Sequence, residues 1–366
     1  MNYSFREEPS LNRTVTFILN KDKPVYNWFY FKEGYSKEFV DYCIDQYGLK
    51  GRIVDPFCGS GTTLLAAKER GLESTGVDVS PLAELVSKVK TQNYDINALR
   101  EEFSKLKAMK PDYKGNPPEK WIRNYFYGRT ISNILFYRNE INKLKDEKAR
   151  DFFLLALINA TDKTANAIKQ GASLKRVKKG PIPVKHVFVN NAKRMIRDLK
   201  KQPELMEKPE AEVLCADSRT VEWKNIDCVI TSPPYMNKIE YTSVYKIELN
   251  LFFKQQETRL RAFISDDVKD QSENSLGVEE AYFKDLRKVL ENLYKGLKDN
   301  GKVIFELAGG CFPDRNIEAD ERLAEIGEDI GFKCKEIVEA RKIQCHRART
   351  FKTGTVRESL VVLEKI

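Results

Sequence analysis

An apolar segment followed by a glycine-rich turn constrains the fold of this chain more than any other feature. Residues 53–63 read Ile-Val-Asp-Pro-Phe-Cys-Gly-Ser-Gly-Thr-Thr, and an apolar run at 64–67 follows. The pattern predicts a strand, a tight turn and a helix, because Gly59 and Gly61 can adopt backbone angles that other residues avoid. The next segment, 73–78, predicts a second strand. Strands that alternate with helices favour a mostly parallel α/β sheet.

The same segment predicts a ligand site. The start of a helix carries backbone N–H groups without intrahelical partners, and the glycines let a ligand approach closely. Asp78 follows Gly61 by about 17 residues, close to the roughly 20-residue offset at which an acid binds ribose hydroxyls in dinucleotide-binding folds. We therefore expect a cofactor that contains a nucleoside.

A second motif predicts a site for a planar amine. The apolar segment 226–230 is followed by Thr-Ser-Pro-Pro-Tyr. The two prolines have no backbone N–H, and each holds the preceding residue extended. The carbonyl groups of Ser232 and Pro233 are therefore expected to point outward as hydrogen-bond acceptors, with the flat face of Tyr235 beside them. Acceptors next to an aromatic ring suit a nucleobase that carries an amino group.

Together, residues 55–63 and 231–235 resemble two motifs of the S-adenosylmethionine-dependent DNA methyltransferases that modify exocyclic amino groups. In that family the first motif binds the methionine part of the cofactor and the second binds the target base. Ser232 after a threonine is similar to the N4-cytosine branch, whereas Asp or Asn at that place is typical of N6-adenine enzymes. The resemblance covers roughly residues 24–95 and 211–366. It implies a Rossmann-like class I α/β fold, with a mostly parallel seven-stranded sheet and helices on both faces.

The resemblance also implies a role for each matching residue. In the family an acid after the third strand binds the adenine amino group of the cofactor, and Asp217 holds that position. The segment 24–47 sits where the amino-terminal cofactor motif precedes the glycine loop. Binding of S-adenosylmethionine is therefore expected at Phe29, Tyr30, Phe31, Asp55, Pro56, Phe57, Cys58, Gly59, Ser60, Gly61, Thr62, Thr63, Asp78, Val79, Asp217, Ser218 and Thr231. Catalysis is expected at Ser232, Pro233, Pro234 and Tyr235.

The spacing of the motifs predicts a large insertion. Asp78 and Asp217 should end neighbouring strands, yet a crossover unit needs only about 30 residues. We assign 1–95 and 212–366 to the catalytic domain and 96–211 to an inserted subdomain. The apolar residues of the insertion recur at helical spacing, so we expect it to be mainly helical. Because it is also basic, it is a candidate DNA-recognition region.

Positive charge concentrates in two places, residues 169–201 and residues 341–352. The net charge is +9, and the stretch from Lys169 to Lys201 contains eleven Lys or Arg against one acid. Such clusters suit contacts with phosphates. We expect double-stranded DNA to bind Lys175, Arg176, Lys178, Lys179, Lys185, Arg347, Arg349 and Lys352. A single basic helix could instead be a solvent-exposed, lysine-rich surface that binds no nucleic acid.

Other classes of protein fit the composition poorly. There is no apolar run long enough to span a membrane and no signal-peptide pattern at the amino terminus. The seven cysteines are scattered and odd in number, which favours a reducing cytoplasm over a disulfide framework. No Cys-x-x-Cys pair occurs and the two histidines are far apart, so we expect no metal site. Cys58 lies in the cofactor loop, and we interpret it as a packing residue.

The chemistry of an exocyclic amine implies a direct displacement. If Ser232 Oγ and the Pro233 carbonyl accept its two N–H bonds, the nitrogen lone pair can point at the methyl group of the cofactor, and catalysis is mostly positioning and electrostatics. Within a duplex the base must be flipped out. We therefore expect a site-specific DNA (cytosine-N4-) methyltransferase, with a cognate restriction endonuclease as a candidate partner. An N6-adenine DNA methyltransferase, a guanine-N2 tRNA methyltransferase and a non-catalytic nucleic-acid-binding module are the alternatives.

Overall fold

The computed structural model describes residues 3–31, 34–170, 173–236, 241–253, 275–312, 315–344 and 354–366. One eight-stranded sheet dominates it, in the order β1-β11-β12-β8-β7-β2-β3-β6. Strand β12 is antiparallel to both neighbours, and every other pair in this sheet is parallel. The strands are β1 (Ser4–Glu7), β2 (Ile53–Asp55), β3 (Ser74–Asp78), β6 (Glu212–Cys215), β7 (Ile226–Thr231), β8 (Leu297–Ala308), β11 (Phe332–Gln344) and β12 (Thr355–Lys365).

The predicted Rossmann-like fold is confirmed, with one strand added. Seven strands, from β6 to β11, form the mostly parallel sheet that we expected. The eighth, β1, pairs with the free edge of β11. A four-residue strand far from the motifs carries little periodic signal, so the sequence pattern did not reveal it.

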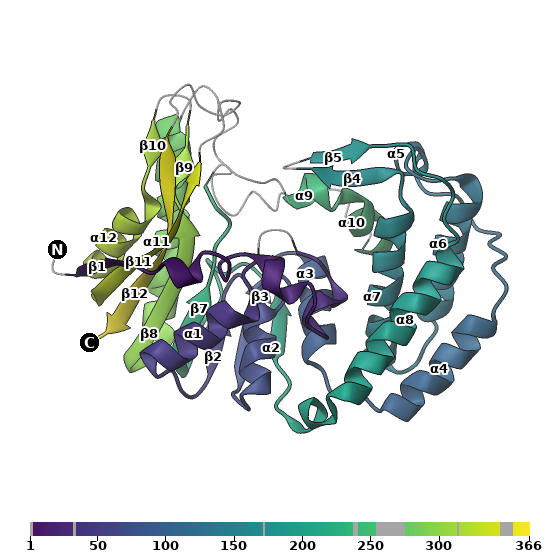
Figure 1. The fold of residues 1–366 in the computed structure, drawn as a ribbon, viewed down its shortest axis with the longest axis horizontal. Coiled ribbons are helices and arrows are strands. Elements are labelled where there is room, and N and C mark those ends of the chain that lie inside the picture. The colour runs from purple at the N-terminus through teal and green to yellow at the C-terminus, as the bar shows by residue number, and fades with distance from the viewer. Residues whose placement is uncertain are drawn as a thin grey trace.

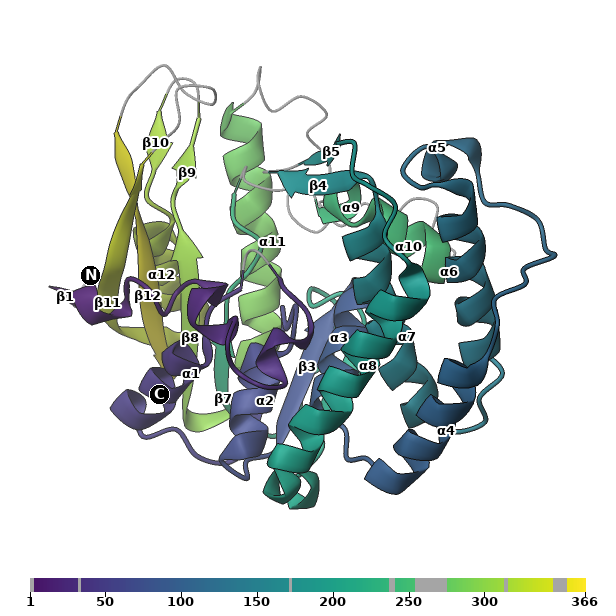
Figure 2. The same cartoon turned by 45° about the vertical axis from the view of Figure 1, so that its right-hand side comes forward.

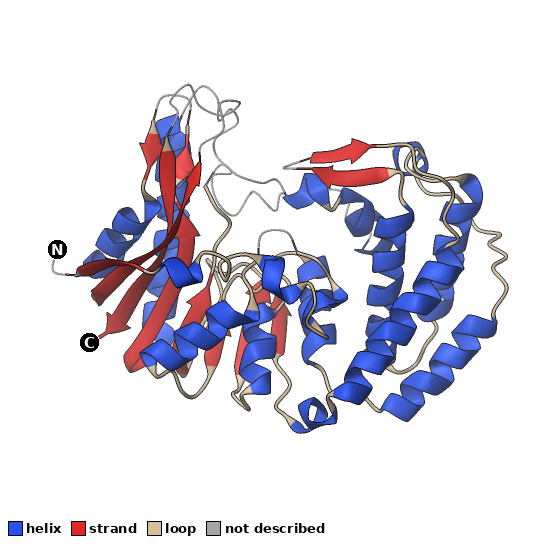
Figure 3. Ribbon diagram, in the orientation of Figure 1, coloured by secondary structure: helices blue, strands red, loops and turns tan. Residues whose placement is uncertain are grey.

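Helices cover both faces of the sheet (Figures 1 and 3). On one face, α1 (Lys37–Tyr47) and α2 (Thr62–Glu69) pack on alternate strand residues such as Leu360 and Val362. On the other face, α11 (Ser275–Gly296) and α12 (Ala319–Ile330) pack on Val361 and Leu363. The alternation arises because successive side chains of a strand point to opposite faces.

A layer of helices extends the molecule beyond α3 (Pro81–Thr91), as Figures 1 and 2 show. It contains α4 (Ile96–Ala108), α5 (Lys120–Arg123), α6 (Gly128–Ile141), α7 (Glu147–Thr164) and α8 (Val184–Lys201). The segment predicted to be mainly helical therefore is so, but it also contains the hairpin β4 (Ala167–Gln170) and β5 (Ser173–Arg176). Its apolar side chains form one continuous core with those of α3. The limits of the predicted subdomain stay a prediction.

Two short helices follow the Ser-Pro-Pro-Tyr motif and pack against this layer. They are α9 (Tyr241–Val244), beside the β4–β5 hairpin, and α10 (Lys246–Phe253), which contacts α3 and α7. The smaller elements are β9 (Gly310–Cys311), β10 (Asn316–Ile317) and the 3₁₀ turns Pro9–Leu11, Phe17–Asn20, Tyr26–Trp28 and Pro203–Glu207. None of the described helices is long and apolar enough to cross a membrane.

Candidate active site

The loops after β2, β3, β6 and β7 meet in one pocket at the carboxyl ends of these strands. Ligands of open α/β sheets bind at this edge. The pocket encloses about 1100 Å³, counted to its open mouth. It is lined by Phe31, Gly34, Tyr35, Asp55, Pro56, Phe57, Cys58, Gly59, Ser60, Thr62, Asp78, Val79, Ser80, Leu82, Ser218, Ser232, Pro233, Pro234, Tyr235 and Tyr245. Most of the predicted cofactor and catalytic residues are therefore brought together.

Asp55 joins three segments at the pocket. Its carboxylate accepts hydrogen bonds from Thr231 Oγ1 at 2.6 Å, the Tyr35 hydroxyl at 3.1 Å and the Phe57 N–H at 3.1 Å. Burial raises the pKa of Asp55, although the hydrogen bond from Thr231 opposes the shift. Asp55 thus fixes the end of β2 against the end of β7, which places the glycine loop beside the Ser-Pro-Pro-Tyr motif.

The glycine loop is held from two sides. Gly59 has φ +50°, and its N–H donates to Asp78 Oδ2 at 3.0 Å; the Ser80 N–H donates to Asp78 Oδ1 at 2.9 Å. Burial raises the pKa of Asp78 to about 6. On the other side, Lys90 Nζ donates to the Ser60 carbonyl at 2.9 Å, and burial lowers the pKa of Lys90 to about 7. The loop is therefore ordered by the protein itself.

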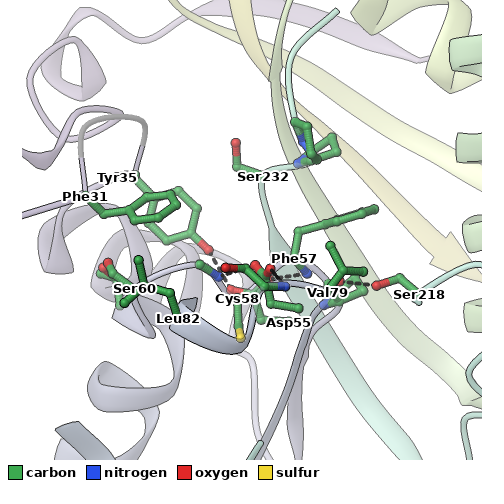
Figure 4. A pocket seen from close by; sticks show the side chains of 18 of the residues that line it. Phe31, Tyr35, Asp55, Phe57, Cys58, Ser60, Val79, Leu82, Ser218 and Ser232 are labelled. Carbon is green, nitrogen blue, oxygen red and sulfur yellow. Dashed lines mark hydrogen bonds between the residues drawn. The ribbon is translucent and has the colours of Figure 1, made fainter. Parts of the chain in front are cut away.

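The hook, defined as residues 232–235, forms the opposite side of the pocket. Figure 4 places the Ser232 side chain across the opening from the loop that carries Asp55 and Ser60. The Ser232 side chain is half-buried, and its hydroxyl has no hydrogen-bond partner among the described residues. It can therefore bond to a ligand without breaking an existing contact.

Tyr235 differs from the simple stacking ring that we expected. Its ring lines the pocket, but its hydroxyl lies 2.6 and 2.8 Å from the two carboxylate oxygens of Glu306 and 2.7 Å from Glu358 Oε1. Both glutamates are 1% exposed, and Glu358 also pairs with Arg341. Burial and then the charge of Glu306 raise the pKa of Tyr235 far above its usual range, so the phenol keeps its proton. This cluster sets the ring orientation before any base binds.

An aromatic pair closes another side of the pocket. Phe31 and Tyr245 are stacked, with ring centroids 5.7 Å apart and planes 8° apart. Lys169 Nζ lies 4.5 Å from the Tyr245 ring centre and 2.5 Å from Glu248 Oε1. Tyr245, from the segment after the hook, is thus tied to the β4–β5 hairpin of the helical layer.

Three predicted cofactor residues lie elsewhere. Phe29 is buried in the core, tilted against Tyr245 at 6.1 Å, and Tyr30 is 51% exposed and packs on Phe17. The Phe29 backbone is extended, so consecutive side chains point to opposite sides. Asp217 does not line the described pocket, and its carboxylate accepts hydrogen bonds from the Arg219 side chain and backbone N–H.

Three others support the pocket from behind. Gly61 has φ +74°, and a Cβ there would lie 2.8 Å from Ser87 Oγ, so glycine is required where α2 crosses α3. Thr63 Oγ1 lies 2.5 Å from the Tyr35 hydroxyl, and Thr231 bonds Asp55.

Five lining residues were not predicted: Gly34, Tyr35, Ser80, Leu82 and Tyr245. Ser80 and Leu82 directly follow the predicted Asp78–Val79 pair, so extending the motif would have found them. Tyr35 lies within the matched segment 24–47, but nothing local distinguishes it from its aromatic neighbours. Tyr245 recurs at helical spacing after the hook, a pattern that equally suits core packing.

The predicted DNA-binding residues fall into three groups. Lys175, Arg176 and Lys178 are exposed and Lys179 is half-exposed, on or just after β5. Lys185 is partly buried and donates to the Met109 carbonyl at 2.8 Å. Arg347, Arg349 and Lys352 lie outside the described residues.

The donors and acceptors of the pocket fit S-adenosylmethionine. Each oxygen of the Asp78 carboxylate accepts one backbone N–H and keeps a lone pair for a ribose hydroxyl. Phe31, Val79 and Leu82 supply apolar walls for a ring. The described part of the chain contains no group of three or more His, Cys, Asp or Glu that could hold a metal.

The chain is similar to several known methyltransferases. A type II methyltransferase of Geobacillus stearothermophilus, M.BsoBI, is 24% identical over 98% of this chain and 89% of its own length. M.AvaI of Nostoc sp. is 24% identical over 91% and 84%. A solved S-adenosylmethionine-dependent methyltransferase of Methanosarcina mazei covers 88% of this chain and 97% of its own, with 9% identity and a TM-score of 0.33.

The family comparison covers most of the chain. Residues 38–304 match the D12 class N6 adenine-specific DNA methyltransferases. The matched range includes the glycine loop, the hook and the whole helical layer. The chain therefore belongs to this family of DNA methyltransferases, and S-adenosylmethionine is its cofactor.

Proposed function

We propose that this DNA methyltransferase transfers the methyl group to the N4 amino group of a cytosine within a specific sequence. The observation that carries the proposal is Ser232, the first residue of the hook, which faces the glycine loop across the pocket and whose hydroxyl has no partner in the described part of the chain. When bound, S-adenosylmethionine supplies an electrophilic methyl group on a positively charged sulfur. The residues of the chain then have to hold the amine in line with that methyl group.

Each part of the pocket has a role in this positioning. Ser232 Oγ and the Pro233 carbonyl accept the two N–H bonds of the amine, which turns the nitrogen lone pair toward the cofactor. The Tyr235 ring stacks on the flipped base, an interaction worth about 1–3 kcal/mol per base. Its anchored hydroxyl keeps the ring in place without an ordering cost at binding. No covalent enzyme intermediate is required.

Adenine N6 is the second candidate target. It is favoured by the family match, which is to N6 adenine-specific enzymes. The hook could hold either amine, because both are planar and carry two N–H bonds. A guanine-N2 tRNA methyltransferase and a non-catalytic module have no comparable support.

The biological setting follows from the relatives. M.BsoBI and M.AvaI are both called type II methyltransferases. By analogy the protein is a modification enzyme, with a cognate restriction endonuclease as its partner and the cytoplasm as its location.

Analysis of methylated nucleosides tests the proposal. The purified chain is incubated with labelled S-adenosylmethionine and unmethylated genomic DNA or total tRNA, and the digested nucleosides are identified by mass spectrometry. N4-methylcytosine supports the proposal, N6-methyladenine replaces the target base, and label in tRNA alone overturns the DNA substrate. Ser232→Ala should abolish the label and keep cofactor binding, while Ser104→Ala, on the exposed side of α4, should change neither.

A further inference from the structure

A second hollow lies outside the methylation pocket, between α5, the end of β5 and α10. It is lined by Glu119, Trp121, Asn124, Tyr125, Arg176, Lys246 and Asn250. It encloses about 1480 Å³, including its open side. We call it the α5–α10 groove. Only Arg176 of these residues belongs to the basic patch predicted from the sequence.

Cations and aromatic rings are combined in this groove. Lys246 Nζ lies 5.5 Å from the Trp121 ring centre and 5.7 Å from the Tyr125 ring centre. The one acid among the lining residues, Glu119, accepts the Trp121 indole N–H at 2.8 Å. Exposed cations continue from the groove along α5, at Lys120 and Arg123, and on or just after β5, at Lys175 and Lys178. The surface therefore has positive charge beside two flat faces.

The aromatic and basic parts are fixed to each other by hydrogen bonds. The Asn166 N–H donates to the Tyr125 carbonyl at 2.7 Å, and the Lys179 N–H donates to Asn166 Oδ1 at 3.1 Å. The Tyr127 hydroxyl donates to the Lys179 carbonyl at 2.6 Å. These bonds join the turn after α5 to the segment after β5, so the groove is formed before a ligand arrives.

We propose that the α5–α10 groove binds the DNA substrate outside the flipped base, an inference that rests on the proposed function. Arg176 and Lys246 contact phosphates, while Trp121 and Tyr125 lie against a flanking sugar or base. Nucleic acid fits better than an acidic protein, because cationic grooves with stacking rings are typical of nucleic-acid sites, and the amides of Asn124 and Asn250 match base edges.

The groove is connected to the methylation pocket by adjacent residues. Tyr245 lines the pocket and its neighbour Lys246, the first residue of α10, lines the groove. Two residues further along, Glu248 pairs with Lys169 of the β4–β5 hairpin at 2.5 Å. DNA held in the groove is thus positioned relative to the pocket by a single short helix.

Tryptophan fluorescence gives a direct test on the full chain. Trp28 and Trp223 are 1% and 7% exposed, whereas Trp121 is half-buried beside the groove. Titration with a duplex from the methylated region should quench the fluorescence of the wild type and leave Trp121→Phe nearly unchanged. Titration with polyglutamate serves as the probe for an acidic protein.

Two charge variants and a matched control sharpen the test. Lys246→Ala and Arg176→Ala should each raise the Kd for DNA about tenfold and lower the salt dependence of binding by about one phosphate contact. Cofactor affinity should stay unchanged, because neither residue lines the methylation pocket. The control, Lys201→Ala, removes the same charge at the carboxyl-terminal end of α8, the end far from α5 (Figure 1), and should not change the Kd for DNA.

The outcomes separate this inference from the proposed function. If the wild type methylates DNA while the groove variants bind it normally, the groove assignment is wrong and the proposed function stands. If duplex quenches Trp121 and the charge variants weaken binding without any methyl transfer, the groove assignment stands and the proposed function fails. Quenching by polyglutamate but not by DNA overturns the nucleic-acid assignment.

Discussion

Removing the charge of Lys169 tests how strongly the helical layer and the pocket depend on each other. Lys169 Nζ lies 2.5 Å from Glu248 Oε1 and 2.8 Å from Asp162 Oδ1. The Glu248 side chain is 2% exposed, while those of Lys169 and Asp162 are 21% and 51% exposed. Breaking a fully buried ion pair from one side costs about 3–5 kcal/mol. Because water reaches part of Lys169, we expect Lys169→Met to lower the free energy of unfolding by about 2–4 kcal/mol.

The dependence on pH has a definite sign. Burial raises the pKa of Glu248 above its ordinary value, against the opposing charge of Lys169. A carboxyl group with a raised folded-state pKa favours folding at low pH, and this contribution is lost as the pH rises through that pKa. Without the lysine the shift should grow, so Lys169→Met should be more destabilising at pH 8 than at pH 5.

Urea unfolding followed by circular dichroism measures these differences. The set consists of the wild type, Lys169→Met, Glu248→Gln and the double variant. We expect the double variant to be more stable than Lys169→Met, because the amide removes the unpaired buried charge. A coupling energy below about 0.5 kcal/mol would show independent sites and refute the reasoning.

Two further predictions concern the glycine loop. Cofactor binding is assigned to the ionised form of Asp78, and burial raises the pKa of this carboxyl group to about 6. The Kd for S-adenosylmethionine, measured by calorimetry, should therefore rise about tenfold for each pH unit below 6. Asp78→Asn should bind the cofactor weakly at every pH, and a wild-type Kd that does not change with pH would contradict the assignment. Burial lowers the pKa of Lys90 to about 7, below its value in the unfolded chain. The free energy of unfolding of the wild type should therefore rise, relative to that of Lys90→Met, by about 1.4 kcal/mol per pH unit between pH 7.5 and 9.5. If urea unfolding gives the two proteins the same dependence of stability on pH, the shift is disproved.

Local signals explain which parts of the site were predictable. The turn at Gly59 and Gly61, the acid at Asp78 and the hook are each encoded within a few residues, and the structure brings them together. Tyr245 could not be assigned in the same way, since its place beside Phe31 depends on α10 packing against the helical layer. Asp217 is a different case, because its carboxylate is bonded to Arg219, only two residues further along the chain, and this bond competes with the cofactor role implied by its position.

The fold, like the site, has parts that are encoded locally and parts that depend on distant packing. The mostly parallel α/β sheet was predicted from the motifs, whereas β1 and the β4–β5 hairpin were not, because they are short elements stabilised by partners that are distant in sequence or by the helices around them. Helical periodicity predicted the layer that contains α4 to α8, because amphipathic helices leave a repeating signal. That signal does not say which surface of the protein the helices will cover.

The continuous core between α3 and the helical layer limits how this enzyme could be redesigned. Trp28, 1% exposed, donates its indole N–H to Asp198 of α8 at 3.0 Å, and its carbonyl accepts from Asn159 of α7 at 2.6 Å. Phe152 of α7 packs edge-on against the same ring. A chimaera that exchanged the whole layer for that of a relative would cut through this interior. New sequence preferences are better sought by grafting outward-facing residues onto α5 and β5 while the inner faces of α7 and α8 are kept.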